Sequence, residues 1–414
     1  MKQQIHTPEG VRDIYGVEYQ KKLVLEEKLQ KVLHLYGYRD IQTPMFEYFE
    51  VFSKEVGTIP SKELYKFFDR DGNTLVLRPD ITPSIARVST TVYENDLKPI
   101  RLCYKGNTFI NHSNYLGKLR ENTQLGAELI GVDSVEADAE MIAMAVESLK
   151  EVGLEDFQIH IGNVGFFEGL IEETQLNEED ELFLRELIHN RNYFGVDELL
   201  ESRKAKITTK TAFQNLPELI GGVEVLKDAK KIALNFQTLE AVKRLEQVYE
   251  LLVAYGVEKH VTFDLSMSGT FGYYTGIIFR GYTYGTGDAI VKGGRYDNLL
   301  GKFGKETPSI GFVIVVDEVL SAFGRQKVDI ALERKTTVVL YDEERIRDAI
   351  SLTKDFRAKG KQIELVKKNA NLSIDEYIAN AKQNMCSTLL YLNKSKEIEM
   401  IHLVSGERKI VTRK

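Results

Sequence analysis

The sequence predicts an α+β protein with more than one domain, and three observations lead to this prediction. The chain has 414 residues, which exceeds the roughly 250–300 residues at which a single hydrophobic core stops growing. Strand-like and helix-like segments are interspersed through residues 1–324, apart from an acidic, helix-favouring block at about 166–254 that predicts a helical insertion. From residue 325 to 414 strand patterns alternate with helix patterns, which indicates a small α/β domain.

The elements before the insertion follow from apolar spacing and from residues that begin or end helices. Apolar residues recur at helical spacing from Leu25 to Tyr36, and Gly37 is expected to end that helix. Asp133–Glu136 resembles a capping box, which would open a helix that stops near Gly153. Strands or extended segments are expected at Tyr38–Pro44, Thr74–Arg78 and Phe157–Ile161, with a further helix over Pro83–Val88.

Strand patterns return after the insertion and continue into the C-terminal domain. The sequence predicts strands at Val261–Leu265, Tyr273–Phe279, Asp288–Val291 and Ile310–Val315. Beyond residue 325 it predicts strands at Thr336–Leu340, Gln362–Val366 and Thr388–Leu392, with helices through Ile350 and Phe356 and around Tyr377. Such alternation predicts a largely parallel sheet.

Two of the expected strands carry polar side chains next to glycine. In Gln124–Ile130 the alternation of a strand puts Gln124, Gly126 and Glu128 on one face. In Tyr273–Phe279 the same alternation pairs Tyr274 with Gly276 and places Tyr273 on the opposite face. Because glycine leaves space beside a polar group, both segments predict a ligand site.

Composition excludes several classes of protein. The chain is 43% hydrophobic and 28% charged, as in globular proteins, and it has no apolar run near the ~20 residues of a membrane span. Its first residues do not resemble a signal peptide. Cys103 and Cys386 lie far apart without metal-ligand spacing, which fits a reducing compartment. We therefore expect a cytoplasmic protein without a membrane segment, a metal site or a cofactor.

The net charge of −7 is unevenly distributed. Residues 325–414 contain 19 Lys and Arg against 13 Asp and Glu, a net of +6, which leaves −13 for residues 1–324. This basic tail keeps an RNA partner open as an alternative. Its charges are scattered and few aromatic residues lie between them, so a solvated surface is the favoured interpretation, and we expect no nucleic-acid partner.

Five short segments carry a family resemblance. In chain order they are Gly37–Pro44, Leu77–Thr82, Gly117–Gln124 with Gly126 and Glu128, Tyr273–Gly276 and Gly293–Asp297. Together they resemble histidyl-tRNA synthetase, a class II aminoacyl-tRNA synthetase, over nearly the whole chain. The resemblance implies an antiparallel sheet core with flanking helices in residues 1–324 and an anticodon-binding-like α/β domain in residues 325–414.

The resemblance also implies a pocket for histidine. Its residues would be Asp80, Thr82, Gln124, Glu128, Tyr273 and Tyr274. Carboxylates, an amide and phenols supply the hydrogen-bonding groups that an ammonium and an imidazole N–H require. Asp80 stands where the synthetase has glutamate, which keeps the charge on a shorter side chain.

The departures from the synthetase pattern concern phosphate chemistry. The synthetase motif Phe-Arg-x-Glu is here Phe109–His112, so that Ile110 replaces an arginine. Gly269 replaces a second arginine, in the Arg-Gly-Leu-Asp-Tyr-Tyr signature, and Glu318 replaces a third. Since losing one preorganised donor costs on the order of 10²–10³ in rate, the three changes should remove several orders of magnitude of adenylation.

A second resemblance is more specific. Phe263–Phe279 and Gly293–Leu300 are more similar to regulatory subunits of ATP phosphoribosyltransferase than to the synthetase. That family implies a chain without catalysis of its own, built on homodimers, that joins the short catalytic subunit at the first step of histidine biosynthesis and transmits feedback inhibition by L-histidine. A divergent histidyl-tRNA synthetase and a synthetase-like RNA-binding or sensing module remain the alternatives.

Overall fold

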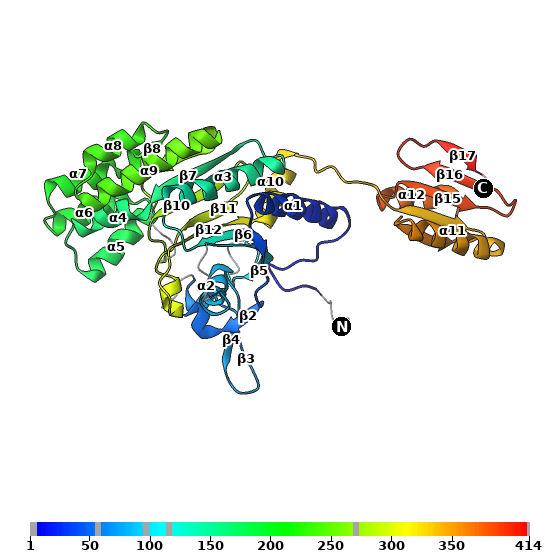
Figure 1. The fold of residues 1–414 in the computed structure, drawn as a ribbon, viewed down its shortest axis with the longest axis horizontal. Coiled ribbons are helices and arrows are strands. Elements are labelled where there is room, and N and C mark those ends of the chain that lie inside the picture. Colours follow the sequence, from blue (N-terminus) through cyan, green and yellow to red (C-terminus); the bar gives the residue numbers. More distant parts are fainter. Residues whose placement is uncertain (1–5, 54–58, 94–98, 113–117, 268–272, 412–414) are drawn as a thin grey trace. The chain divides into compact units, whose positions relative to one another are not determined.

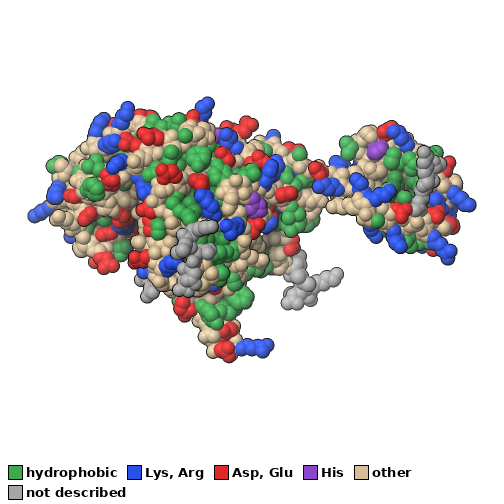
Figure 2. Space-filling view, viewed as in Figure 1, with side chains coloured by type: hydrophobic (Ala, Val, Ile, Leu, Met, Phe, Trp, Pro, Cys, Tyr) green, Lys and Arg blue, Asp and Glu red, His purple; other side chains and the backbone are tan. Residues whose placement is uncertain are grey.

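The computed structural model describes residues 6–53, 59–93, 99–112, 118–267 and 273–411. These residues form two compact units: residues up to 13 and 25–329 make the first, and residues 14–24 and 330–414 the second. On the face shown in Figure 2, basic and acidic side chains are interspersed on both units. None of the described helices is both long enough and apolar enough to cross a membrane.

The first unit is built on a large, mainly antiparallel sheet. Among the described residues it has nine strands, in the order β1-β5-β6-β12-β11-β10-β7-β9-β8, and only the β1/β5 and β7/β9 pairs are parallel. An antiparallel core in residues 1–324 is what the sequence predicted. The strands are β1 (Arg39–Asp40), β5 (Ile100–Phe109), β6 (Glu121–Ile130), β7 (Phe157–Asn163), β8 (Ile220–Gly221), β9 (Val261–Asp264), β10 (Ile277–Thr283), β11 (Val291–Arg295) and β12 (Ser309–Val315).

Helices and a small sheet cover this large sheet. In Figure 1, α3 and α10 lie over one face, while α2 and the small sheet lie on the opposite side. Ser134, not Asp133, is the N-cap of α3, and its hydroxyl accepts from Ala137 N at 3.2 Å. These helices are α2 (Thr82–Thr91), α3 (Val135–Glu151) and α10 (Val316–Gln326), and the small sheet has the order β2 (Phe46–Tyr48), β4 (Thr74–Leu77), β3 (Lys66–Phe68). The helix α1 (Gly16–Leu35) is divided between the two units at Leu25.

The block expected as an insertion is helical in the structure. It packs into a cluster of helices at one end of the large sheet, with the short β8 among them (Figure 1). Asn235 caps α9 in a capping box with Thr238, and Gly256 ends that helix at φ +71°. The helices are α4 (Val164–Glu172), α5 (Glu178–His189), α6 (Tyr193–Ser202), α7 (Ile207–Asn215), α8 (Val225–Ile232) and α9 (Phe236–Tyr255).

Within the second unit, the described residues 330–411 form a mixed sheet with the helices α11 and α12. Its order is β14-β13-β15-β16-β17; β13 pairs in parallel with β14 and β15, but the β15/β16 and β16/β17 pairs are antiparallel. The prediction of a largely parallel sheet missed these last two strands. The elements are β13 (Thr337–Tyr341), α11 (Ile346–Ala358), β14 (Ile363–Lys367), α12 (Ile374–Gln383), β15 (Thr388–Leu392), β16 (Ile398–His402) and β17 (Arg408–Val411).

Two predicted strand boundaries in the first unit were wrong. The segment predicted to be a strand from Tyr273 becomes one only at Ile277, and the segment predicted from Asp288 only at Val291. Of the extended segment Tyr38–Pro44, only Arg39–Asp40 is a strand. The first difference matters most, because residues 273–276 lie before the strand, and the alternation of a strand therefore does not govern their side chains.

Candidate ligand-binding site

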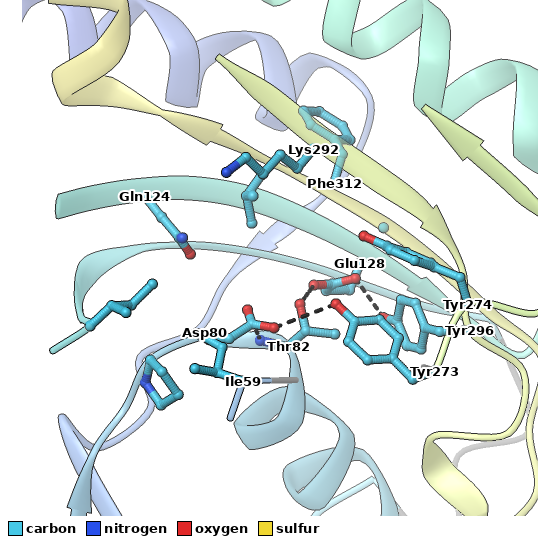
Figure 3. Close-up of a pocket in the computed structure, with 14 residues that line it drawn as sticks. Ile59, Asp80, Thr82, Gln124, Glu128, Tyr273, Tyr274, Lys292, Tyr296 and Phe312 are labelled. Atoms are coloured by element: carbon cyan, nitrogen blue, oxygen red, sulfur yellow. Dashed lines mark hydrogen bonds between the residues drawn. The ribbon is translucent and has the colours of Figure 1, made fainter. Parts of the chain in front are cut away.

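A small pocket lies on the large sheet between α2, the turn before β10 and the strands β6, β11 and β12 (Figure 3). Its cavity volume is about 80 Å³. Since one water molecule needs roughly 10–15 Å³ on the same measure, the pocket has room for one small molecule. All six residues predicted for a histidine pocket line it together. The lining residues are Ile59, Pro79, Asp80, Thr82, Ile110, Gln124, Glu128, Tyr273, Tyr274, Lys292, Tyr296, Gly311, Phe312 and Val313.

The strand β6 brings the amide and one carboxylate into the pocket. Gln124 and Glu128 both line it, whereas Leu125, Ala127 and Leu129 are buried in the core. This confirms the predicted alternation along Gln124–Ile130. Between the two polar residues, a Cβ on Gly126 would come within 2.7 Å of the Tyr104 ring, so that glycine here makes room for a tyrosine of β5.

Glu128 is the polar centre of the pocket floor. Its side chain is 1% exposed, and its carboxylate accepts hydrogen bonds from Thr82 Oγ1 at 2.8 Å, Tyr104 Oη at 3.0 Å and the Tyr296 hydroxyl. Burial raises the pKa of Glu128 to about 7, although the three hydrogen bonds by themselves would lower it. A carboxylate has about four acceptor positions, so one remains for a donor from a ligand, and such a donor would favour the ionised form.

Gly311 of β12 provides the space that Glu128 occupies. It pairs with Glu128 across the sheet, and a Cβ at position 311 would lie 1.5 Å from Glu128 Oε2 and 2.7 Å from the backbone oxygen of Ala127. Both are far inside van der Waals contact, and backbone cannot move away as a flexible side chain can. The carboxylate position therefore depends on glycine at this point of the neighbouring strand.

Gly311→Ala should displace Glu128 and weaken ligand binding at this pocket by about 10-fold or more, since the carboxylate would lose the geometry of its hydrogen bonds. Binding of candidate amino acids, measured by calorimetry, checks this. Gly324→Ala is the matched control, because a Cβ at this position in α10 meets nothing within 4 Å and alanine favours a helix. Equal binding by both variants would contradict the role assigned to Gly311.

A second carboxylate enters from the loop before α2. Asp80 Oδ1 accepts from the backbone N–H of Thr82 at 3.2 Å, and Asp80 Oδ2 lies 3.5 Å from the Tyr273 hydroxyl. Burial raises the pKa of Asp80. Arg78, two residues earlier, is buried and donates to the backbone oxygens of Thr43, Pro44 and Asn107. This arginine fixes the loop and does not line the pocket.

The amide of Gln124 has an oxygen without a donor. Gln124 Oε1 is buried and finds no hydrogen-bond partner within the part of the chain that the structure describes. Buried polar atoms are nearly always paired, so an orphaned acceptor on a pocket wall indicates a position for a ligand donor. An ammonium group at this point would meet Gln124 and Asp80 on the same side of the pocket (Figure 3).

Both tyrosines of the expected strand face the pocket. Tyr273 and Tyr274 lie in the turn before β10 with ring centroids 4.7 Å apart, so the prediction that they face opposite ways was wrong. Thr275 holds this turn, since its N–H donates to Arg295 O at 2.8 Å and its hydroxyl to Asp297 Oδ2 at 2.9 Å. The turn is thus fastened to the end of β11.

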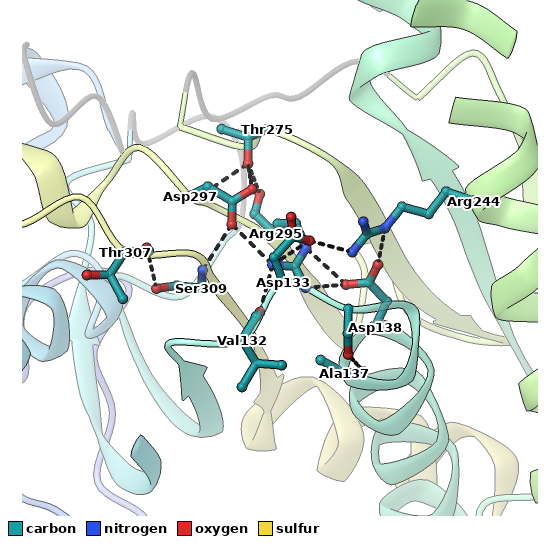
Figure 4. A network of polar contacts seen from close by, with 11 residues as sticks. Val132, Asp133, Ala137, Asp138, Arg244, Thr275, Arg295, Asp297, Thr307 and Ser309 are labelled. Carbon is teal, nitrogen blue, oxygen red and sulfur yellow. Dashed lines mark hydrogen bonds and ion pairs between the residues drawn. The ribbon is translucent and has the colours of Figure 1, made fainter. Parts of the chain in front are cut away.

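A buried ion network behind the sheet supports that strand end (Figure 4). Arg295 is 2% exposed and donates to Asp138 of α3 at 2.7 Å, to Asp297 at 3.1 Å and to the backbone oxygen of Val132 at 3.0 Å. Arg244 of the helical insertion also donates to Asp138, at 2.6 Å. Leaving one partner of such a buried pair unpaired costs about 3–5 kcal/mol. The network joins α3, α9 and β11, and Arg295 is not a pocket cation.

The residues at the lost arginine positions have different surroundings. Ile110 lines the pocket, so an apolar side chain stands at the position where the resemblance puts an arginine. Glu318 is in α10, and burial followed by the nearby charge of Asp288 raises its pKa. Gly269 lies outside the described residues. Neither described position offers a cation.

Sequence reasoning missed three residues that shape the site. Tyr296 lines the pocket and donates to Glu128. It belongs to the segment Gly293–Asp297, one of the five that carry the family resemblance, and could have been predicted from that segment. Lys292 precedes the same segment and also lines the pocket. Tyr104 lies in β5, a strand that sequence reasoning did not predict, and faces Gly126 through the register of β5 and β6.

The chain is similar to known proteins of one family over most of its length. A family model described as histidyl-tRNA synthetase matches residues 10–319. An ATP phosphoribosyltransferase regulatory subunit of Acetivibrio thermocellus is 42% identical over 361 residues, which are 87% of this chain and 86% of the relative. One of Clostridium botulinum is 34% identical over 98% of this chain and 93% of the relative. The chain belongs to the family of ATP phosphoribosyltransferase regulatory subunits.

Solved structures agree with the regulatory-subunit family. A Bacillus halodurans crystal structure described as an ATP phosphoribosyltransferase regulatory subunit/histidyl-tRNA synthetase superposes with a TM-score of 0.82 at 32% identity, covering 95% of this chain and 98% of that one. Histidyl-tRNA synthetase from Nostoc gives a TM-score of 0.80 at 21% identity, over 99% and 97% of the two chains. These matches confirm the predicted class II synthetase-like fold.

Proposed function

We propose that this chain is the regulatory subunit of an ATP phosphoribosyltransferase, without catalysis of its own, and that its pocket binds L-histidine as a feedback inhibitor. It would assemble, as a homodimer, with a separate short catalytic subunit that performs phosphoribosyl transfer at the first step of histidine biosynthesis. The two buried free cysteines support a reducing compartment such as the cytoplasm.

The observation that carries the proposal is that the pocket has groups suited to an amino acid but lacks groups that would stabilise phosphate charge. Histidine-binding chemistry is present, with Glu128, Asp80, Gln124 and two tyrosines around one small space. The groups for stabilising phosphate charge are absent at the described positions 110 and 318. A site that keeps amino-acid recognition but lacks transition-state electrostatics is suited to sensing and not to adenylation.

The imidazole and the ammonium group of a bound histidine each have a partner of suitable chemistry. The remaining acceptor position on Glu128 suits an imidazole N–H, and the tyrosine rings beside it suit the flat face of the imidazole. The orphaned oxygen of Gln124 and the carboxylate of Asp80 suit the ammonium group. Thr82 is already engaged by Glu128 at 2.8 Å, so its role would be to hold that carboxylate in place.

Feedback inhibition requires coupling between this pocket and the catalytic partner. We infer that histidine favours a less active arrangement of the complex. Reciprocity then requires that histidine bind with a different affinity when the partner holds its own substrates, by about 5- to 150-fold for a typical coupling of 1–3 kcal/mol.

Co-purification with a short-form catalytic subunit, followed by activity assays with and without histidine, tests the proposal. The expected outcome is a complex that is active and inhibited by histidine, together with calorimetric binding of histidine to this chain. A chain that binds no histidine, alone or in the complex, would contradict the pocket assignment. Transfer RNA binding that falls steeply with salt would instead favour the RNA-binding alternative.

A further inference from the structure

The charges that line the pocket do not balance without Lys292. Among the described lining residues, Asp80 and Glu128 are the acidic groups and Lys292 is the only basic one. An amino acid brings a carboxylate as well as an ammonium group. Two carboxylates in the wall would repel it, because like charges in a partly buried site disfavour each other. A cation is therefore needed at the carboxylate end of the ligand.

The register of the sheet puts the Lys292 side chain on the pocket face. Lys292 pairs with Val313 of β12, which also lines the pocket, and Val313 pairs in turn with Gly126 of β6. Gly294 shares the face of Lys292 in β11, and a Cβ on Gly294 would meet the Tyr274 ring at 2.8 Å. Lys292 thus stands on the same surface as the polar residues of β6.

The ammonium of Lys292 points along the pocket toward Gln124 and away from the tyrosines (Figure 3). This is the end of the pocket opposite to the Tyr273, Tyr274 and Tyr296 side chains around Glu128. A ligand with its imidazole at Glu128 would direct its amino-acid end toward Lys292. The position agrees with the orphaned amide oxygen of Gln124, which suits the ammonium at that same end.

Asp288 holds Lys292 in place. Lys292 Nζ lies 3.4 Å from Asp288 Oδ2, and Lys118 Nζ lies 3.1 Å from the same oxygen. Asp288 is therefore shared by two lysines, and the charge of Lys292 also acts on the nearby Glu318. Since an ammonium has three donors, Lys292 can keep Asp288 and still donate to a ligand.

We propose that Lys292 binds the α-carboxylate of the amino-acid ligand and makes the pocket specific for amino acids over the corresponding amines and alcohols. This rests on the proposed function of the pocket as a histidine site. Lys292 supplies a cation from β11, whereas the other described residues that line the pocket supply none. The pocket then offers one complementary group to each charged end of a zwitterion and an acceptor to its side chain.

The test compares two ligands against two variants by calorimetry. L-histidine carries the carboxylate, and histidinol replaces it with a hydroxymethyl group. Lys292→Met should weaken histidine binding by about 10- to 100-fold, the range expected when a hydrogen bond to a charged group is lost, and should change histidinol binding by less than about 3-fold. Lys292→Arg should retain most of the preference for histidine.

Lys105→Met is the matched control. It removes the same charge from the same sheet, at a residue of β5 that pairs with Glu26 at 3.0 Å and does not line the pocket. Its binding of both ligands should equal that of the native chain, and thermal melting of all three variants reports on folding.

The possible results separate the two proposals. Equal losses for histidine and histidinol in Lys292→Met, or a native chain that binds both ligands equally, would overturn the role of Lys292 while leaving the histidine site intact. A native chain that binds neither ligand would overturn the proposed function itself. If Lys292→Met does not fold, the role of Lys292 is tested by the other two measurements. These are the preference of the native chain for histidine over histidinol and the retention of that preference in Lys292→Arg.

Discussion

Glu128→Gln should weaken histidine binding by about 100-fold or more and make the assembled complex insensitive to histidine. Glutamine keeps the volume but offers one acceptor oxygen, and its NH₂ group would face one of the hydroxyls of Thr82, Tyr104 and Tyr296 that donate to Glu128. Removing one partner of a buried, charged hydrogen bond to a ligand typically costs 2–5 kcal/mol. Calorimetry and inhibition curves of the complex measure both effects.

Glu121→Gln is the control for this substitution. It makes the same change in the same strand, at a residue that accepts from Asn107 Nδ2 at 2.7 Å and does not line the pocket. Its histidine affinity should stay within about 2-fold of the native chain. Uninhibited activity of the complex should be the same for both variants, since Glu128 acts through the inhibitor. Native histidine affinity in Glu128→Gln would remove Glu128 from the proposed site.

Histidine-dependent ATP–pyrophosphate exchange should be at background, at least about 10⁴-fold below a histidyl-tRNA synthetase measured alongside. One missing electrostatic donor costs on the order of 10²–10³ in rate, and losses at several positions accumulate even when they are not additive. Here Ile110 and Glu318 occupy two of the positions concerned, and Gly269 the third. The exchange assay is to be run on a preparation whose histidine binding has been measured.

The single variant Ile110→Arg should also remain at background, because it restores one cation while Glu318 still opposes phosphate charge. Exchange well above background in the native chain would contradict a non-catalytic role and favour the divergent synthetase.

The sequence predicted the parts of the site that depend on residues close together in the chain better than the parts that depend on distant ones. Gln124 and Glu128 were placed together correctly because two-residue alternation is a local property of a strand. Tyr273 and Tyr274 were separated incorrectly because the strand begins only at Ile277. A chain that approaches a sheet in a turn can direct consecutive side chains to one side, and periodicity cannot show where the turn ends.

Lys292 and Tyr104 show a second limit. Neither is close in sequence to Glu128, and each reaches the pocket through strand order: β5 pairs with β6, and β11 lies beyond β12. Strand order and register are set by non-local pairing and by which faces are buried. The two antiparallel strands at the end of the C-terminal sheet were missed for the same reason.

By itself, the sequence determined the family, the class of fold and six of the residues that line the pocket, because residue identities and their order along the chain are enough for a resemblance. Only the tertiary structure decided which hydroxyls surround Glu128, that burial raises its pKa to about 7, and that Lys292 lines the same pocket. Burial and charge balance arise between strands that are distant in the chain, so they exist only once the sheet has formed.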